Sequence, residues 1–215
     1  MTLIEHDDRP TTPAQAWQRL TEGNARFIAE ESAHPNQDIG LRHELAGYQN
    51  PFAIFFGCGD SRVAAEIIFD QGLGDLFVVR TAGHVFDPSV LGSLEFGVAV
   101  LDCPLIVVLG HDSCGAVKAA MEAVETGVMP PGYLRDIVER VTPSVLAATR
   151  SGRTSVEEIE GEHVAQTCHL IADRSAIIAD RIRSGRLAIV GAEYHLAHGE
   201  AQVITVVGDV GPGAA

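Results

Sequence analysis

Short, uniformly apolar runs alternate with longer amphipathic segments along most of the chain. Apolar runs of strand length without polar alternation are typical of parallel strands that are buried on both faces. The segments between them place apolar residues at helical spacing, and some end at a glycine. The pattern predicts strands at 52–57, 76–80, 105–109, 187–191 and 202–207, and helices at 13–30, 64–69, 87–101, 113–125, 133–141, 143–150 and 157–184.

Three of these boundaries depend on single residues. Ser89 is expected to cap the helix that begins near residue 87, because its hydroxyl accepts from free amides of the first turn. Pro143 is expected to separate two helices, since proline removes a helical hydrogen bond. Gly185 is an expected helix stop. Residues 31–51 are polar and mixed, so no element is predicted there.

The element order predicts an α/β fold. Apolar strands separated by helices indicate a mainly parallel sheet that is covered on both faces. The last two strands are close enough in sequence to form a hairpin, so we expect four parallel strands and one antiparallel edge strand. Residues 1–12 are expected to be a flexible tail and residues 13–210 a single domain, because no repeat or break in composition divides them.

Composition narrows the function classes. The chain has 215 residues and a formal net charge of -14, which argues against binding to nucleic acids or anionic membranes. The polar, acidic start is unlike a signal peptide, and no apolar run reaches the ~18 residues of a membrane helix, so we expect a cytoplasmic protein. In that compartment the four cysteines indicate metal ligands, reactive thiols or buried apolar side chains.

Two short polar segments, 58–62 (CGDSR) and 111–114 (HDSC), each follow an apolar strand and lead into a helix. Loops at the carboxyl ends of parallel strands share one edge of the sheet, so these segments are expected to meet. Cys58, His111 and Cys114 then form an N/S ligand set suited to zinc. The nearby helix amino termini favour the thiolate form of both cysteines. Three protein ligands leave one coordination position open, as in catalytic zinc sites.

Asp60 and Arg62 lie beside the first expected ligand. Asp60 is a candidate fourth ligand or a group that orients water, and Arg62 is placed to pair with its carboxylate bidentately. If the pair forms, Arg62 decides which of the two roles Asp60 takes.

Five motifs together resemble one known family. They are C-x-D-S-R at 58–62, H-x-x-C-G at 111–115, FVVRTAG at 77–83, GSLEF at 92–96 and IVVLGH at 106–111. The sequence resembles the β-class carbonic anhydrases from about residue 17 to residue 207, and most of all the bacterial, actinobacterial-type members.

The resemblance implies a reaction and a cofactor. One zinc ion per subunit would be held by Cys58, His111 and Cys114, and zinc-bound hydroxide would hydrate carbon dioxide reversibly to bicarbonate and a proton. Asp60 and Arg62 would form a dyad that gates the fourth zinc position. In a closed state, Asp60 itself would be the fourth ligand.

The resemblance also implies a substrate pocket and an assembly. Phe96 stands where a tyrosine is common, so a hydroxyl is missing from that wall. Phe55 stands where some members have a tryptophan of a second bicarbonate site, which argues against such a site. The resemblance implies a homodimer or homotetramer, with the N-terminal helix packed on a neighbouring subunit. The implied substrate-binding residues are Gln49, Phe77, Ala82, Gly83, Phe96 and Gly115.

The remaining cysteines and histidines receive simpler interpretations. Cys103 and Cys168 are expected to be buried free thiols. His84 is a weaker candidate for a proton shuttle, whereas His195 and His198 are expected to face solvent in the hairpin turn.

Three alternatives remain open at this point. A related zinc hydrolase acting on another small linear electrophile, such as carbon disulfide, would carry the same metal motif. A non-catalytic zinc scaffold would keep Asp60 as a permanent ligand, but it would not need Arg62. A redox protein would instead use a disulfide between Cys58 and Cys114.

Overall fold

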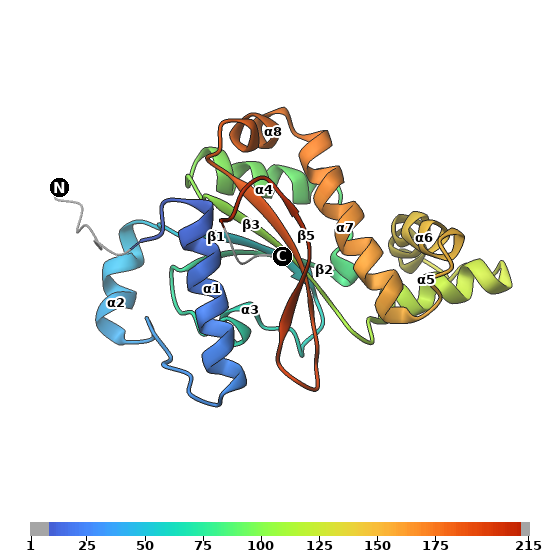
Figure 1. Ribbon diagram of the computed structural model, residues 1–215, viewed down its shortest axis with the longest axis horizontal. Coiled ribbons are helices and arrows are strands. Elements are labelled where there is room, and N and C mark those ends of the chain that lie inside the picture. Colours follow the sequence, from blue (N-terminus) through green and yellow to red (C-terminus); the bar gives the residue numbers. More distant parts are fainter. Residues whose placement is uncertain (1–8, 212–215) are drawn as a thin grey trace.

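A five-stranded sheet forms the centre of the computed structural model, which describes residues 9–211 (Figure 1). The strand order is β2-β1-β3-β4-β5. The pairs β2–β1, β1–β3 and β3–β4 are parallel, and β5 is antiparallel to β4, so the predicted fold class is confirmed. The strands are β1 (Ala53–Cys58), β2 (Leu76–Thr81), β3 (Leu105–His111), β4 (Ala188–Tyr194) and β5 (Ala201–Val207).

Helices connect these strands and cover the sheet. Two are single 3-10 turns, η1 (Leu45–Gly47) and η2 (Ala82–His84). The α-helices are α1 (Pro13–Ile28), α2 (Ile39–Glu44), α3 (Ala65–Ile68), α4 (Pro88–Ala99), α5 (Gly115–Thr126), α6 (Leu134–Arg150), α7 (Val156–Arg174) and α8 (Ala176–Arg183). None of the helices in the described range is both long and apolar enough to cross a membrane.

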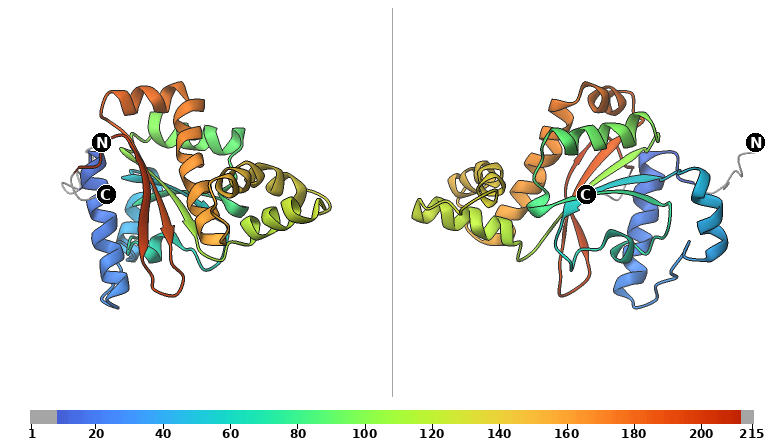
Figure 2. Two further views of the ribbon diagram at one scale, coloured as in Figure 1. Left: turned by 45° about the vertical axis from the view of Figure 1, so that its right-hand side comes forward. Right: turned by 180° about the vertical axis from the view of Figure 1, so that it is seen from behind.

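Successive strand residues point to opposite faces of the sheet and so build two cores. Phe55 and Val107 face the cluster that includes residues of α1 and α3. Ile54 and Val108 face the cluster that includes residues of α4, α7 and α8. The sheet is therefore covered on both sides, while α5 and α6 project from one end as a helical hairpin (Figures 1 and 2).

Helix α1 begins as the sequence predicts and packs on its own chain. Thr12 caps it, and the Gln15 side chain bonds back to the cap in a capping box. Trp17 and Leu20 are buried in the cluster that also contains the strand residues of that face. The apolar stripe of α1 is thus covered by the sheet of the same chain, and the expected packing of this helix on a neighbouring subunit stays a prediction for its exposed face.

Helix α6 runs unbroken through Pro143, so the predicted division into two helices is wrong. Proline removes one backbone hydrogen bond, but packing on either side of it holds the helix together. Val138 and Val141 before the proline and Val145 after it are all buried in one cluster with residues of α5.

The predicted long helix 157–184 is instead divided at Ser175. This residue has extended backbone angles, with φ -111° and ψ 112°, and separates α7 from α8. Its hydroxyl accepts from Ile178 N at 3.1 Å and donates to Glu95 at 2.6 Å. A serine that satisfies a free amide of the next helix is an N-cap, so it interrupts the helical pattern.

Two further expectations are corrected at other helix starts. Asp87, rather than Ser89, caps α4, because its carboxylate accepts from Val90 N at 2.8 Å. Residues 31–51 contain α2 and η1, which have no buried residues and hence no apolar pattern to reveal them.

The predicted tail is described only in part. Residues 1–8 lie outside the described residues, but Arg9 donates to the Pro51 carbonyl oxygen at 2.6 Å.

Candidate metal centre

The two polar segments meet at one edge of the sheet. Cys58 is the last residue of β1 and His111 is the last residue of β3, and these strands are parallel neighbours. The chain leaves β1 toward β2 on one side, whereas β3 lies on the other side. The carboxyl ends of β1 and β3 therefore flank a point where the strand order reverses, which is where ligands bind in open α/β sheets.

Three potential metal ligands converge at this point. The ligand atoms of Cys58, His111 and Cys114 lie within 4.8 Å of one another, and all three residues are buried. His111 Nδ1 lies 2.8 Å from the Asp112 carbonyl oxygen, which only accepts, so Nδ1 carries the proton. His111 Nε2 is buried and has no hydrogen-bond partner among residues 9–211. Its lone pair is free for a metal, in the arrangement common for ligating histidines.

The two sulfur atoms share a proton unequally. A hydrogen bond with the Cys114 thiol lowers the pKa of Cys58 well below its ordinary value. The Gly83 amide also donates to Cys58 Sγ at 3.3 Å. Gly83 has φ +62°, and a Cβ there would lie 2.5 Å from the Ala116 Cβ, so a glycine is needed for this approach. Cys58 is thus prepared as a thiolate, the form that binds metal.

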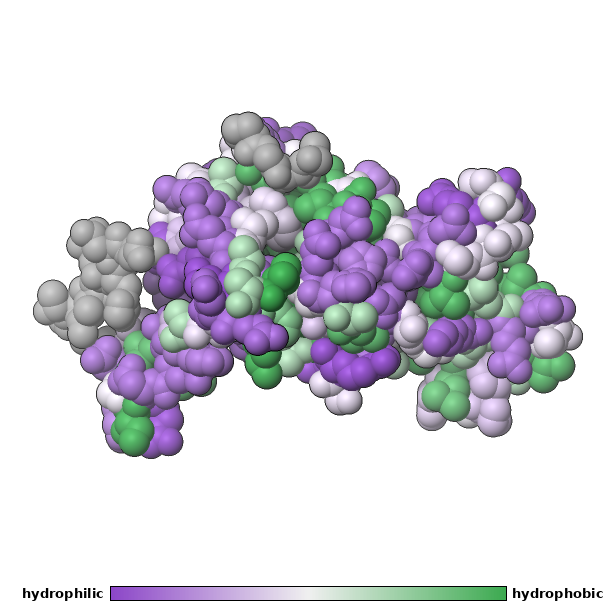
Figure 3. Space-filling view, turned by 60° about the horizontal axis from the view of Figure 1, so that its bottom comes forward, coloured by the Kyte–Doolittle hydropathy of each residue, from purple (hydrophilic) through white to green (hydrophobic). Residues whose placement is uncertain are grey.

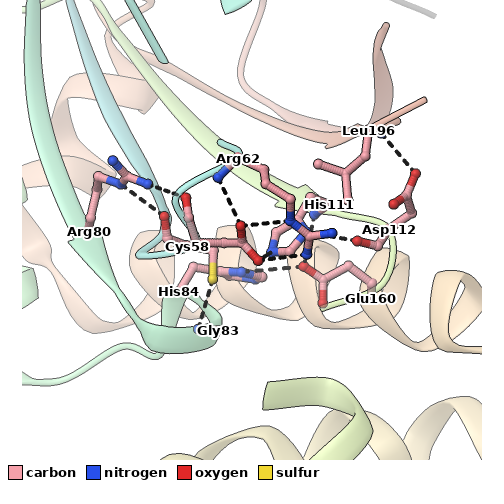
Figure 4. Close-up of polar contacts among 10 residues, drawn as sticks. Cys58, Arg62, Arg80, Gly83, His84, His111, Asp112, Glu160 and Leu196 are labelled. Carbon is pink, nitrogen blue, oxygen red and sulfur yellow. Dashed lines mark hydrogen bonds and ion pairs between the residues drawn. The ribbon is translucent and has the colours of Figure 1, made fainter. Parts of the chain in front are cut away.

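Asp60 and Arg62 form a bidentate pair (Figure 4). Arg62 Nε and Nη2 donate to the two carboxylate oxygens of Asp60 at 3.0 and 2.8 Å, and the Arg62 amide donates at 2.9 Å. These hydrogen bonds from Arg62 lower the pKa of Asp60 below its usual range. Asp60 Oδ2 lies 3.9 Å from His111 Nε2, so the carboxylate is beside the ligand group while Arg62 holds it.

Arg80 on the edge strand β2 fixes the loop that carries this pair. Its guanidinium donates to the carbonyl oxygens of Cys58 at 2.9 Å and Asp60 at 2.5 Å (Figure 4). The Gly59 amide donates to the Thr81 carbonyl oxygen at 2.8 Å. The loop after β1 is therefore tied to β2 at three places.

A buried polar layer lies behind the ligand group, and the sequence analysis did not identify it. Glu160 on α7 accepts from the His111 amide at 3.1 Å, and it lies 3.6 Å from His84 Nδ1. The ring centroids of His84 and His163 are 4.4 Å apart, and His163 bonds to Ser144 and the Gly83 carbonyl oxygen. No spacing in the sequence joins residues 84, 160 and 163, so only the packing of α7 on the sheet reveals them.

Burial sets the charge state of this layer. It raises the pKa of Glu160 to about 8 and lowers the pKa of His163 to about 4. His84 is fully buried, which places its pKa well below the ordinary value. A buried ring does not exchange protons directly with solvent, so the candidate role of His84 as a shuttle is not supported.

The six implied pocket residues separate into two groups. Ala82 and Gly83 lie in the turn η2 that follows β2, and Gly115 is the first residue of α5, directly after Cys114, so all three lie next to the ligand group. The second group does not reach it within one chain. Gln49 is exposed before β1, at the opposite end of that strand from Cys58. Phe77 pairs in register with Ile54, roughly 13 Å along the strand from Cys58, and its ring lies 6.0 Å from that of Phe96.

The cysteines and histidines that were not assigned to the metal centre mostly behave as expected. Cys103 and Cys168 are buried free thiols, and burial raises the pKa of each to about 12. His198 is exposed, but His195 is only partly exposed and lies 3.3 Å from Gln202 Oε1.

Comparison with known proteins identifies the family. Residues 53–201 match the family described as carbonic anhydrase. The chain is 56% identical over 201 residues to carbonic anhydrase 2 of Mycobacterium tuberculosis, covering 94% of this chain and 97% of that protein. It is 55% identical over 201 residues to the carbonic anhydrase of Mycolicibacterium smegmatis, covering 94% and 98%.

A solved structure agrees with these sequence matches. The β-carbonic anhydrase of Coccomyxa, solved in complex with acetazolamide, superposes with a TM-score of 0.69 at 25% identity, covering 88% of this chain and 87% of that one. Sequence, strand order and the placement of both motifs at one sheet edge lead to the same conclusion. The chain belongs to the β-class carbonic anhydrases, a family of lyases.

Proposed function

We propose that the chain holds one zinc ion with Cys58, His111 and Cys114 and catalyses the reversible hydration of carbon dioxide to bicarbonate and a proton. The observation that carries this proposal is the buried, unpartnered Nε2 of His111, which lies against two buried cysteines. A buried nitrogen without a partner is costly unless a ligand satisfies it.

The donor set fits zinc better than a harder cation. Two sulfur atoms and one imidazole are soft ligands, and three protein ligands leave a position for a small molecule. When bound in such a site, zinc lowers the pKa of water to ~7, which supplies hydroxide at neutral pH.

Asp60 and Arg62 supply the groups that orient the reaction. The ionised carboxylate of Asp60 only accepts hydrogen bonds, so it selects and orients a protonated partner such as the reacting water. Arg62 engages both oxygens of Asp60 and thereby keeps the carboxylate from becoming a ligand itself. We propose that this competition gates the fourth metal position.

Arg62 also gives the entrance a local positive charge. Its side chain is 53% exposed, while the chain as a whole carries a formal net charge of -14. Bicarbonate is an anion, so an exposed guanidinium beside the ligand group favours its approach and departure at this edge.

We further propose a homodimer or homotetramer in the cytoplasm. Within residues 9–211, the edge strand β2 pairs only with β1, and such edges commonly pair with another chain. Exposed apolar side chains also gather on the projecting hairpin of α5 and α6 (Figure 3). They include Val124, Val128, Leu134 and Leu146. Light scattering after gel filtration would measure the mass of the assembly.

Metal analysis combined with stopped-flow carbon dioxide hydration at pH 8.5 tests the proposal. The purified chain should contain about one zinc per subunit and be active. Cys114→Ser should lose zinc and activity together, whereas Cys103→Ser, which changes a buried thiol outside the site, should keep both. A zinc-loaded chain that hydrolyses carbon disulfide but does not hydrate carbon dioxide would overturn the proposed substrate.

A further inference from the structure

A second group of potential metal ligands lies beside the first but contains no cysteine. Asp112 follows β3, Glu157 lies in the first turn of α7, and His195 follows β4. Their ligand atoms lie within 4.8 Å of one another. Figure 4 shows that the Asp112 carboxylate points away from Cys58, toward Leu196, whose amide donates to it at 2.9 Å. The two groups therefore occupy different sides of the loop after β3.

The ring of His195 is oriented as a ligand. Its Nε2 lies 3.3 Å from Gln202 Oε1, an oxygen that only accepts, so the ring tautomer that makes this hydrogen bond carries its proton on Nε2. The lone pair of Nδ1 is then free and lies 3.9 Å from Asp112 Oδ2. That separation is too long for a hydrogen bond but suits two ligands of one ion. A hydrogen bond at the other ring nitrogen is the usual support for a ligating histidine.

A buried carboxylate provides an independent sign of a missing partner. Glu193 is 5% exposed, and its Oε1 has no hydrogen-bond partner among residues 9–211. It pairs across the strands with Gln202, so the two side chains share the face that holds the His195 ring. A Cβ at Gly161, one helical turn after Glu157 on α7, would lie 3.9 Å from Glu193 Oε2. The Glu193 carboxylate therefore points toward the start of α7, where Glu157 lies.

Basic side chains balance the charge of this group only in part, because Arg62 interacts with Asp112 electrostatically without forming an ion pair with it. Within the described range, no lysine or arginine forms an ion pair with Asp112, Glu157 or Glu193. Carboxylates held this close repel one another, and the buried member lacks a donor. A divalent cation would reduce the repulsion between these carboxylates and would give the buried Glu193 carboxylate a positively charged partner.

We propose that Asp112, Glu157 and His195, supported by Glu193, bind a divalent cation that prefers oxygen and nitrogen ligands, such as Mn²⁺. Ligands at about 2.1 Å from one ion are at most about 4.2 Å apart, so the 3.9 Å pair already fits. The carboxylate of Glu157, which lies within 4.8 Å of both other ligand atoms, belongs to an exposed side chain that can rotate to complete the set. The cation joins the end of β3, the start of α7 and the β4–β5 hairpin, directly beside His111.

Manganese titration of the purified, zinc-containing protein tests the proposal, with bound Mn²⁺ counted by electron paramagnetic resonance. Wild type should bind one Mn²⁺ per chain without releasing zinc. Glu157→Gln and His195→Gln should each weaken that binding by more than about tenfold, and Gln202→Leu by about tenfold. His198→Gln changes an exposed histidine of the same hairpin and should bind as wild type does.

Thermal unfolding of the same protein samples provides a second test of the manganese site. Mn²⁺ should raise the thermal unfolding midpoint of wild type and of His198→Gln, but not that of His195→Gln. No binding to wild type at millimolar Mn²⁺, equal binding by all variants, or uptake only as zinc leaves would each overturn the second site. Zinc content and carbon dioxide hydration are measured in parallel without Mn²⁺, so a failure of the proposed enzyme function is seen separately.

Discussion

At the scale of single residues, neighbours give chemically ordinary side chains specific tasks. The Asp112 carbonyl oxygen fixes the proton of His111 on Nδ1 and so leaves the lone pair of Nε2 free for the proposed metal. Arg62 likewise occupies both oxygens of Asp60. In both cases the hydrogen bonds made by a neighbour determine which atoms remain available to a metal.

Replacing Arg62 tests this principle at the carboxylate. In Arg62→Ala, the Asp60 carboxylate loses its bidentate partner and becomes free to take the fourth zinc position. We expect hydration activity to fall at least about tenfold while zinc content stays unchanged. Stopped-flow rates and X-ray absorption of the zinc measure the two effects. The matched control is Arg140→Ala, which removes an arginine paired with Asp136 away from the site. Wild-type rates in Arg62→Ala would contradict the gating role.

The buried His163 predicts a pH dependence of stability. Burial lowers its pKa to about 4 from 6.5, so the folded chain resists a proton that the unfolded chain accepts. This contribution is fully present above pH 6.5 and is lost as the pH falls toward 4. Relative to His163→Gln, the free energy of unfolding of wild type should decrease by on the order of 3 kcal/mol between pH 7 and pH 4.

Urea unfolding at several pH values measures this difference. The control is His169→Gln, an exposed position on the same helix. Parallel pH profiles for wild type and His163→Gln would rule out the buried histidine as the cause.

At the scale of elements, the apolar pattern predicted all five strands. β1, β3 and β4 are buried at every position and must be apolar on both faces, whereas the edge strands β2 and β5 are only partly buried. The apolar pattern predicted helix boundaries less accurately, because polar contacts and local packing determine where a helix ends. Ser175 ends one helix and caps the next through contacts that the pattern does not record, and Pro143 remains in a helix that packing on both sides stabilises. α2 has no buried face, so no periodicity reveals it.

The ligand residues of the candidate site could be predicted from the sequence, but the residues around them could not. Its ligand residues lie in two short motifs at strand ends, which the sequence displays directly. Glu160 was not predictable, because it reaches His111 only through the packing of α7. Gly110 permits that approach, since a Cβ there would lie 2.6 Å from Glu160 Oε1. Gln49, predicted for the pocket, lies at the far end of β1 because the strand separates it from Cys58.

Helix α1 contributes one face of the core, and Trp17 tests how much that contact stabilises the fold. Trp17 is 5% exposed and packs with the strand residues of that face. Trp17→Ala removes a large buried side chain and should lower the free energy of unfolding by about 3–5 kcal/mol. Chemical denaturation measures the change, with the exposed Gln18→Ala as control. A loss below about 1 kcal/mol would mean that α1 is not part of the cooperative core.

At the scale of the whole molecule, the site joins segments that are distant in sequence. Cys58 ends β1, His111 ends β3, and Cys114 precedes α5. A metal bound to all three connects the central strands to the projecting α5–α6 hairpin. Metal binding should therefore contribute to global stability as well as to catalysis.

Zinc removal tests this connection. Treatment with a zinc chelator should lower the thermal unfolding midpoint of wild type, because a ligand that binds only the folded state stabilises it. Added zinc should restore the midpoint. Cys114→Ser should show little response to either treatment, and an equal response in both proteins would contradict a structural contribution from this site.

The most direct measurement is stopped-flow carbon dioxide hydration by zinc-loaded wild type and Asp60→Asn at pH 8.5, with zinc content determined on the same samples. Asn is nearly isosteric but cannot offer Arg62 two anionic oxygens or orient the reacting water as a carboxylate does. We predict about one zinc per chain in both proteins, rapid hydration by wild type and a loss of at least about a hundredfold in the variant. Equal rates in the two proteins, or no hydration by zinc-loaded wild type, would contradict the proposed role of this site.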